Sequence, residues 1–355
     1  MLQLPMMPDI EVSIVLLLVL SLTSGVISGF VGVGGGFIMT PALIILGFPA
    51  QYAVGTGMLW VMGNSIIGTL RHRRLGNVDF KLGCVMIVFM MFGVELGIRA
   101  LHTAINAGVA EASVLIVTIC VLILVGGSIF LESARTKARL DKMIKEKNKS
   151  EQSSGFSFIT SALSRIHIPP VLNFPKANVR VSLWVLLIIG VTAGALAGFI
   201  GVGGGFIIVP SLVYIFGVPS FIAVGTSLFQ IIFPAAFGAA RYTIDGNVVI
   251  FAAFIMILGS SAGIYFGSLL TRYLRDISMR YTLAITILVA VMGSIIKVIT
   301  ITSSNETAWL KFAMTVITFG GLALIVFLLI GLFIAAIRRK KGKYIPVWTQ
   351  SLVKD

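Results

Sequence analysis

The chain has 355 residues, of which 57% are hydrophobic and only 11% are charged, and its formal net charge is +14. Soluble domains are about 45–50% apolar and about 25% charged, so this composition excludes an ordinary soluble protein and indicates a polytopic helical membrane protein. The positive charge does not predict a nucleic-acid partner, because the basic residues lie in loops and the tail and no nucleic-acid-binding motif is present.

Apolar segments are expected, in chain order, at 13–30, 37–47, 53–70, 82–102, 112–132, 182–199, 206–216, 223–240, 248–270, 281–300 and 310–337. A helix needs about 20 apolar residues to span a bilayer. The segments 37–47 and 206–216 are too short to cross, and each directly follows a run of glycines. Between Arg135 and Arg180 the sequence is charged and then serine-rich, which predicts a polar linker made of a short surface helix followed by coil.

Two copies of one pattern flank this linker. The stretch GFVGVGGGFIMTPAL, from Gly29 to Leu43, matches GFIGVGGGFIIVPSL, from Gly198 to Leu212, at an offset of 169 residues. The motif AVGT and later an arginine and an Asn follow in both copies at an offset of 170. A repeat spacing of this size is too long for a solenoid and corresponds to the length of half a transporter.

The distribution of Lys and Arg predicts the topology. If each glycine-broken unit (13–47 and 182–216) enters the membrane and returns, the N-terminus lies outside and 23 of the 27 Lys and Arg residues lie in inner loops or the tail. If each unit crossed once, the basic linker and the basic tail would lie on opposite sides, against the positive-inside rule. The hairpin arrangement is therefore favoured, and the two copies then begin on opposite sides.

We therefore expect an all-α polytopic membrane protein with two inverted-topology repeats. Each repeat is a glycine-broken helical hairpin plus three transmembrane helices, and one extra helix follows at the C-terminus. The expected parts are a first transmembrane repeat at 1–134, a basic cytoplasmic linker at 135–180, a second repeat at 181–300, an extra helix at 301–337 and a basic cytoplasmic tail at 338–355. Broken helices at matching places in inverted repeats are typical of secondary transporters with a substrate site at the membrane midplane.

The glycine runs predict that site. Glycine allows positive φ and close approach by a ligand, and the first N–H groups of the helix after each run are unpaired and carry partial positive charge. Two such helix starts facing each other would form a site for a small anion. The alternative is close helix packing through small residues. The candidate substrate-binding residues are Gly34, Gly35, Gly36, Phe37, Thr56, Asn64, Gly203, Gly204, Gly205, Phe206, Thr226 and Gln230.

Four of these candidates have competing explanations of their own. Thr56 and Thr226 either add hydroxyl donors or bond a carbonyl of their own helix. Gln230, like Asn64, is polar in an otherwise apolar helix, which a pore lining or an interhelical hydrogen bond would both explain.

Three charged residues are candidates for gating or coupling. Arg71 and Arg241 match across the copies and are expected at the two openings of the transport path, one on each side of the membrane. There they either repel cations or extend their side chains to the membrane interface. Glu95 stands four residues before Arg99, a spacing that permits a salt bridge, and ionisable residues at membrane depth suggest function. The position that matches Glu95 is Tyr265, which weakens the case for proton coupling through it.

No enzyme chemistry is predicted. Cys84 and Cys120 lie in apolar runs without metal-site spacing, and the three histidines are scattered, so we expect no metal and no cofactor. The motif GxxxxGK[ST] does not occur, so ATP is not expected to be the direct energy source.

The paired glycine motifs followed by AVGT resemble those of the sulfite exporter TauE/SafE family of membrane permeases. The resemblance covers most of the chain except the linker and the tail, and its motif carries over onto Gly34 to Gly36, Gly203 to Gly205, Pro41 and Pro210. It implies transport of small sulfur-containing anions, such as sulfite or sulfonates, across the bacterial inner membrane, with a periplasmic N-terminus and a cytoplasmic C-terminus. The alternative is an intramembrane enzyme or a membrane biogenesis factor. The anion, the direction of transport, the coupling ion and any homo-oligomer are left open by the sequence.

Overall fold

The structure is a computed structural model that describes residues 2–4, 7–145, 169–303, 308–340, 346 and 352. Before the linker the helices are α1 (Ile14–Val31), α2 (Gly36–Ile45), α3 (Ala50–Arg74), α4 (Phe80–Asn106) and α5 (Ala110–Lys145). After it come α7 (Leu183–Ile200), α8 (Gly205–Pro210), the π-helix η1 (Ser211–Ile215), α9 (Ser220–Ile244), α10 (Ile250–Tyr273) and α11 (Asp276–Ser303). The last segment is α12 (Ala308–Thr315), the π-helix η2 (Val316–Gly320) and α13 (Gly321–Lys340).

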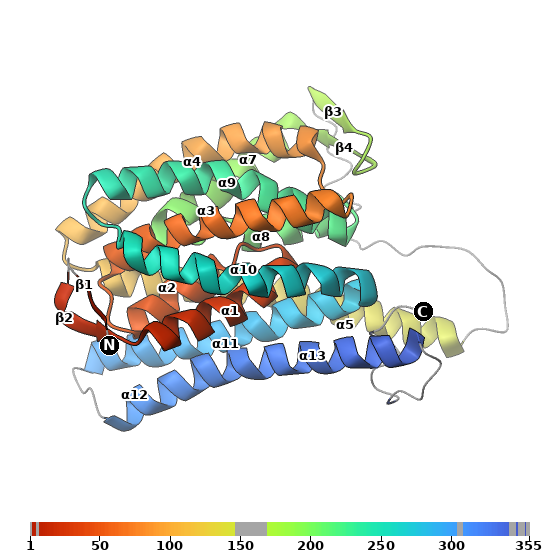
Figure 1. Cartoon of the computed structure of the whole chain (residues 1–355). Helices are drawn as coiled ribbons and strands as arrows, with labels where there is room; N and C mark the ends of the chain where they lie inside the picture. Colours follow the sequence, from red (N-terminus) through yellow and green to blue (C-terminus); the bar gives the residue numbers. More distant parts are fainter. Residues whose placement is uncertain are drawn as a thin grey trace.

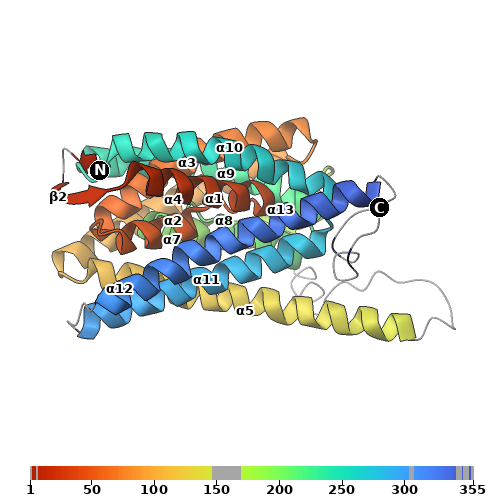
Figure 2. The same cartoon turned by 60° about the horizontal axis from the view of Figure 1, so that its bottom comes forward.

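Two short antiparallel hairpins complete the described residues. One pairs β1 (Leu2–Leu4) with β2 (Met7–Val12), and the other pairs β3 (Val171–Phe174) with β4 (Val179–Ser182). Figure 1 shows the first hairpin at one end of the helix bundle and the second hairpin at the other end, and Figures 1 and 2 show that α13 also finishes at this other end. The start of α7 and the end of α13 therefore lie at the same end of the bundle.

Among the described residues, nine helices are long and apolar enough to cross a membrane. This confirms the prediction of an all-α membrane protein. The apolar helices Gly36–Ile45 and Gly205–Ile215 are shorter than a span, as expected from their lengths in the sequence. Two details differ from expectation: α5 continues as helix to Lys145, and the last span is divided by the π-helical turn η2.

Glycines allow two pairs of helices to pack closely. A Cβ added to Gly25 would lie 2.5 Å from the carbonyl oxygen of Ser260, and one added to Gly29 would lie 2.6 Å from that of Ile264. The contacts advance together along both helices, so α1 and α10 pack closely in parallel. The same relation holds between α4 and α7, where added Cβ atoms on Gly93 and Gly97 would collide with the backbone of α7. Backbones approach this closely only where side chains are small.

The directions of α1 and α3 explain the short helix between them. On α3, Trp60 donates to the carbonyl oxygen of Met256 and Arg71 stacks on Tyr265, so α3 also runs parallel to α10. Since α1 and α3 point the same way, α2 must bring the chain back toward the end where α1 begins. The chain therefore reverses its direction between the end of α1 and the start of α3.

Helices α3 and α9 cross the centre of the bundle in opposite directions. An added Cβ on Gly55, near the start of α3, would collide with the carbonyl oxygen of Asn247, just after α9. An added Cβ on Gly225, near the start of α9, would collide with that of Asn77, just after α3. Each of these helices therefore starts where the other ends. Together they hold the two glycine breaks at the middle of the structure.

Candidate functional site

The first glycine break joins α1 to α2. Gly32, Gly34 and Gly35 have φ of 80°, 77° and 78°, a left-handed conformation that favours glycine. Gly35 caps α2, and its carbonyl oxygen accepts hydrogen bonds from the N–H groups of Ile38 and Met39 at 3.1 and 3.2 Å. The N–H groups of Gly36 and Phe37, the first two residues of α2, come too early in the helix to have an intrahelical acceptor. The break thus presents the positive end of a helix inside the protein.

The second break repeats this geometry between α7 and α8. Gly201, Gly203 and Gly204 have φ of 80°, 75° and 78°. The carbonyl oxygen of Gly204 accepts from the N–H groups of Ile207 and Ile208, both at 3.1 Å. The two glycine runs that match in sequence therefore also match in backbone conformation.

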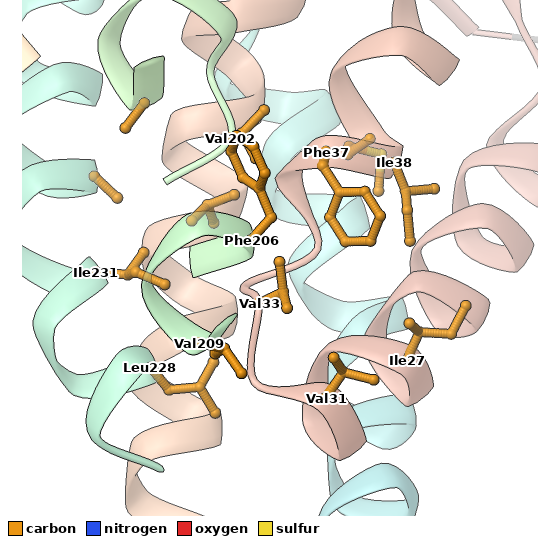
Figure 3. Packing of buried hydrophobic residues seen from close by; sticks show 14 of the residues in the cluster. Ile27, Val31, Val33, Phe37, Ile38, Val202, Phe206, Val209, Leu228 and Ile231 are labelled. Atoms are coloured by element: carbon orange, nitrogen blue, oxygen red, sulfur yellow. The ribbon is translucent and has the colours of Figure 1, made fainter. Parts of the chain in front are cut away.

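The two breaks lie against one another. A Cβ added to Gly36 would lie 2.6 Å from the Cα of Val202, and one added to Gly205 would lie 2.6 Å from the carbonyl oxygen of Val33. Figure 3 shows the two irregular segments passing side by side, with Val33 between them and the rings of Phe37 and Phe206 above it. The centroids of these two rings are 6.5 Å apart. The starts of α2 and α8 are thus brought together within the buried core.

Two buried amides belong to the helices around the breaks. Asn64, on α3, donates from Nδ2 to the carbonyl oxygen of Gly34 at 3.1 Å and to Ser28 Oγ at 3.2 Å. Among the described residues, Asn64 Oδ1 and both amide atoms of Gln230, on α9, have no hydrogen-bond partner although the side chains are buried. An unsatisfied buried polar atom costs about 1–3 kcal/mol. Such atoms near a pair of helix starts are suited to a polar ligand.

Thr56 and Thr226 make a different contact from either one that the sequence suggested. The hydroxyl of Thr56 accepts from the N–H group of Val249 at 3.0 Å, and that of Thr226 accepts from the N–H group of Asp79 at 2.9 Å. Neither bond runs to a carbonyl of the same helix. Each threonine instead ties its helix to the start of a helix in the other half of the chain.

The charged candidates separate into two clusters. Glu95 forms the expected salt bridge with Arg99 at 2.9 Å and also approaches the Nε of Arg241 at 3.6 Å. Arg71 has no such carboxylate: its guanidinium lies 3.5 Å from the centroid of the Tyr265 ring. Tyr265 occupies the position that matches Glu95. Arg241 therefore lies beside a carboxylate, whereas Arg71 lies beside an aromatic ring.

Two further buried residues were not identified as functional from the sequence. The Nε2 of His72 lies 2.9 Å from the carbonyl oxygen of Gly29, and the hydroxyl of Tyr242 donates to that of Gly198 at 2.7 Å. His72 and Tyr242 stand at matching positions, 170 residues apart, as do the two glycines at 169. The offset of 170 residues could have identified His72 and Tyr242 as a matching pair. Because the two side chains differ chemically, nothing in the sequence indicated that both bond a helix carbonyl. Both bonds hold the end of a helix just before its glycine break.

Metal chemistry has no support in the described part of the chain, where no group of three or more His, Cys, Asp or Glu side chains could hold an ion. Cys84 and Cys120 are both free and exposed on the surface of the bundle.

Comparison with known proteins decides the family. The sequence profile described as sulfite exporter TauE/SafE matches residues 17–294, which include both glycine breaks and all the helices from α3 to α10. The chain belongs to the sulfite exporter TauE/SafE family. This is a family of membrane transporters, so the alternative of an intramembrane enzyme is wrong.

Curated relatives of this TauE/SafE chain carry matching descriptions. It is 25% identical over 268 residues to the probable membrane transporter protein YunE of Bacillus subtilis, covering 73% of this chain and 89% of the relative. It is 24% identical over 263 residues to YdhB (74% and 92%) and 25% identical over 289 residues to YjnA (79% and 98%), both described as probable membrane transporter proteins of the same organism. No solved structure matches the chain.

Proposed function

We propose that this TauE/SafE protein is a secondary transporter of small sulfur-containing anions, such as sulfite or organosulfonates, with its site where the two glycine breaks meet. The observation that carries the proposal is the contact of Gly36 with Val202 and of Gly205 with Val33. It brings together two helix starts, each with unpaired N–H groups and a partial positive charge. Such ends bind anions without a fixed cation.

The chemistry of the surrounding side chains supports an anion rather than a cation. The residues of the two breaks, from Gly32 to Phe37 and from Gly201 to Phe206, include no carboxylate. Among the described residues, the buried amide of Gln230 on α9 keeps an unpaired Nε2 donor. The Nδ2 of Asn64 on α3 already donates to Gly34 and Ser28, so Asn64 positions the first break instead. Backbone and amide donors recognise oxyanions by hydrogen bonding, which suits sulfite and sulfonate groups.

We also propose that the two halves are inverted-topology repeats, spanning 1–134 and 181–300 around the linker. The antiparallel course of α3 and α9 supports this, as does the reciprocity of contacts across the halves. The Thr56 bond to Val249 has its counterpart in the Thr226 bond to Asp79. The pairing of α1 with α10 likewise has its counterpart in the pairing of α7 with α4. Such symmetry provides two alternative arrangements around one site, which alternating access requires.

The bias of Lys and Arg supports an orientation with the N-terminus outside and the linker and tail inside. We therefore propose a multi-pass protein of the bacterial inner (plasma) membrane with a periplasmic N-terminus, and the descriptions of the relatives as membrane transporters support the membrane setting.

The test is flux of radiolabelled sulfite into proteoliposomes that contain the purified chain. We expect uptake above that of protein-free vesicles, with inhibition by excess unlabelled sulfite or an organosulfonate and none by excess choline. Transport of a monovalent cation that excess sulfite leaves unchanged would contradict the proposal.

A further inference from the structure

A second basic site lies away from the glycine breaks, between the C-terminal ends of α3 and α10. It is a cavity of about 210 Å³, lined in part by Arg71, Arg74, Tyr265 and Arg272. A neighbouring hollow of about 270 Å³ shares Arg74 and Arg272, so the two form one cleft. Of the residues that the structure describes, no acidic one lines either hollow. Each hollow alone is smaller than the range of about 300–1,000 Å³ for drug-sized ligands, which suits a single small group.

The arginines of this cleft are not occupied in capping their own helix. Basic residues in the last turn of a helix often bond its final carbonyl groups. In α3 those carbonyls already accept from backbone: the N–H of Leu75 bonds His72, that of Gly76 bonds Arg73, and that of Asn77 bonds His72, at 3.0 to 3.1 Å. Within the described residues, the guanidinium groups of Arg71 and Arg74 on α3 therefore remain available to a ligand.

Nearby side chains leave the charge of the cleft uncompensated. Arg71 stacks on Tyr265, which fixes its position without neutralising it. Asp79, the acidic residue that follows α3, is buried, and its carboxylate oxygens accept the N–H groups of Leu82 and Ala177. Ser268 also lines the cleft, but its hydroxyl donates to the carbonyl oxygen of Tyr265. Recognition thus depends on the arginines.

The matching place at the other end of the bundle is built differently. There Glu95 occupies the position of Tyr265 and approaches both Arg241 and Arg99. A carboxylate at that position neutralises the arginines and would repel an anion. Among the described residues, the exchange of a carboxylate for an aromatic ring therefore leaves the charge of Arg71 without a neutralising partner, unlike that of Arg241.

We propose that Arg71, Arg74 and Arg272 form a binding site for a phosphate- or sulfate-type oxyanion at this end of the bundle. Guanidinium groups bind such oxyanions by charge-assisted, often bidentate hydrogen bonds. The oxyanion has two sources, a soluble anion or the head group of an anionic phospholipid at the membrane surface. The site is separate from the glycine breaks and does not rest on the proposed transport function.

The test compares two double variants of the full chain in an uncharged detergent. Arg74→Gln with Arg272→Gln removes two charges from the cleft, and both side chains are exposed, so folding should persist. Arg73→Gln with Arg338→Gln removes two exposed arginines that line neither hollow. Sodium sulfate is titrated calorimetrically at constant ionic strength, and retention of phosphatidylglycerol against phosphatidylcholine is measured by native mass spectrometry.

We expect the cleft variant to lose about tenfold or more in affinity for sulfate, for phosphatidylglycerol or for both, and the control variant to stay within about twofold. A loss of sulfate affinity identifies a soluble anion as the ligand. A loss of phosphatidylglycerol retention alone identifies a lipid head group. Equal affinity in all three proteins, or equal loss in both variants, would overturn the proposal. Sulfite flux, measured separately, reports on the glycine breaks, so failure of one proposal is distinguishable from failure of the other.

Discussion

The hydroxyl of Tyr242 donates a 2.7 Å hydrogen bond to the carbonyl oxygen of Gly198, three residues before the left-handed Gly201 ends α7. His72 makes the matching 2.9 Å contact with Gly29, three residues before Gly32 ends α1. The carbonyl groups of a last helical turn lack intrahelical donors, so each bond satisfies an acceptor that the glycine break leaves free. An aromatic or imidazole ring on a central helix thereby anchors each broken helix.

Replacing Tyr242 with Phe should lower the free energy of unfolding by about 1 kcal/mol, because the Gly198 carbonyl loses its donor in a buried place. Unfolding of the purified protein by SDS in mixed micelles measures the change. Tyr265→Phe is the control, since the Tyr265 side chain is 55% exposed and the variant keeps the ring under Arg71. An equal loss in both variants would argue against an anchoring role for Tyr242.

Replacing Gly34 with Ala should strongly reduce sulfite flux per folded molecule. Space is available there, since the added Cβ would lie 3.4 Å or more from its nearest neighbours. The change should therefore leave the fold intact while placing a methyl group at the break.

Gly76→Ala is the matched control, because Gly76 has φ of 78° beside 77° at Gly34 and nothing lies within 4 Å of its added Cβ. Both variants carry the same left-handed strain of about 1–2 kcal/mol. If both retain normal flux per folded molecule, the glycine runs serve packing and the proposed anion site is wrong.

Gly97→Ala should prevent the close approach of α4 and α7, since its Cβ would collide with the carbonyl oxygen of Ala195. Overpacking of this kind costs about 1–3 kcal/mol, so the yield of monodisperse protein and its melting temperature should fall. Gly331→Ala, on α13, meets nothing within 4 Å and should leave stability unchanged or raise it by up to about 1 kcal/mol. A melting temperature of Gly97→Ala equal to that of the wild type would contradict the packing described for α4 and α7.

The proposed orientation predicts opposite labelling at two matching positions. Arg73 and Thr243 are both exposed, near the ends of α3 and α9. In a chain with Cys84 and Cys120 replaced by Ala, a cysteine at Arg73 should react with a membrane-impermeant maleimide only from inside, and one at Thr243 only from outside. Cysteines at Ser153 and Ser351, which lie outside the described residues, should label from the same side as Arg73. Labelling of Ser153 and Ser351 from opposite sides would contradict the inverted arrangement.

Much of this fold could be predicted from the sequence because its signals are local. Apolar length gives the spans, and the glycine runs give the breaks. The Glu95–Arg99 bridge follows from a spacing of four residues on one helix. Each of these inferences needs only residues that are close together in the chain.

The contacts that could not be predicted join residues far apart in sequence. Trp60 donates to Met256, and Arg71 stacks on Tyr265, only because α3 lies beside α10. Composition alone does not say which helices are neighbours. The same limit applies to the hydroxyl of Thr226, which bonds Asp79 rather than a carbonyl of its own helix.

The parallel pairing of α1 with α10 and of α4 with α7 sets an order for biogenesis. When α1 and α4 enter the bilayer, the helices that cover their glycine faces have not yet been synthesised. Those faces remain without their partner helices until α7 and finally α10 have been inserted. The first half therefore cannot complete its own packing, and a chain that stops after the linker should insert as separate helices and be recognised by membrane proteases. Assembly of the two halves is a late event, and it is the step at which both glycine breaks acquire their final form.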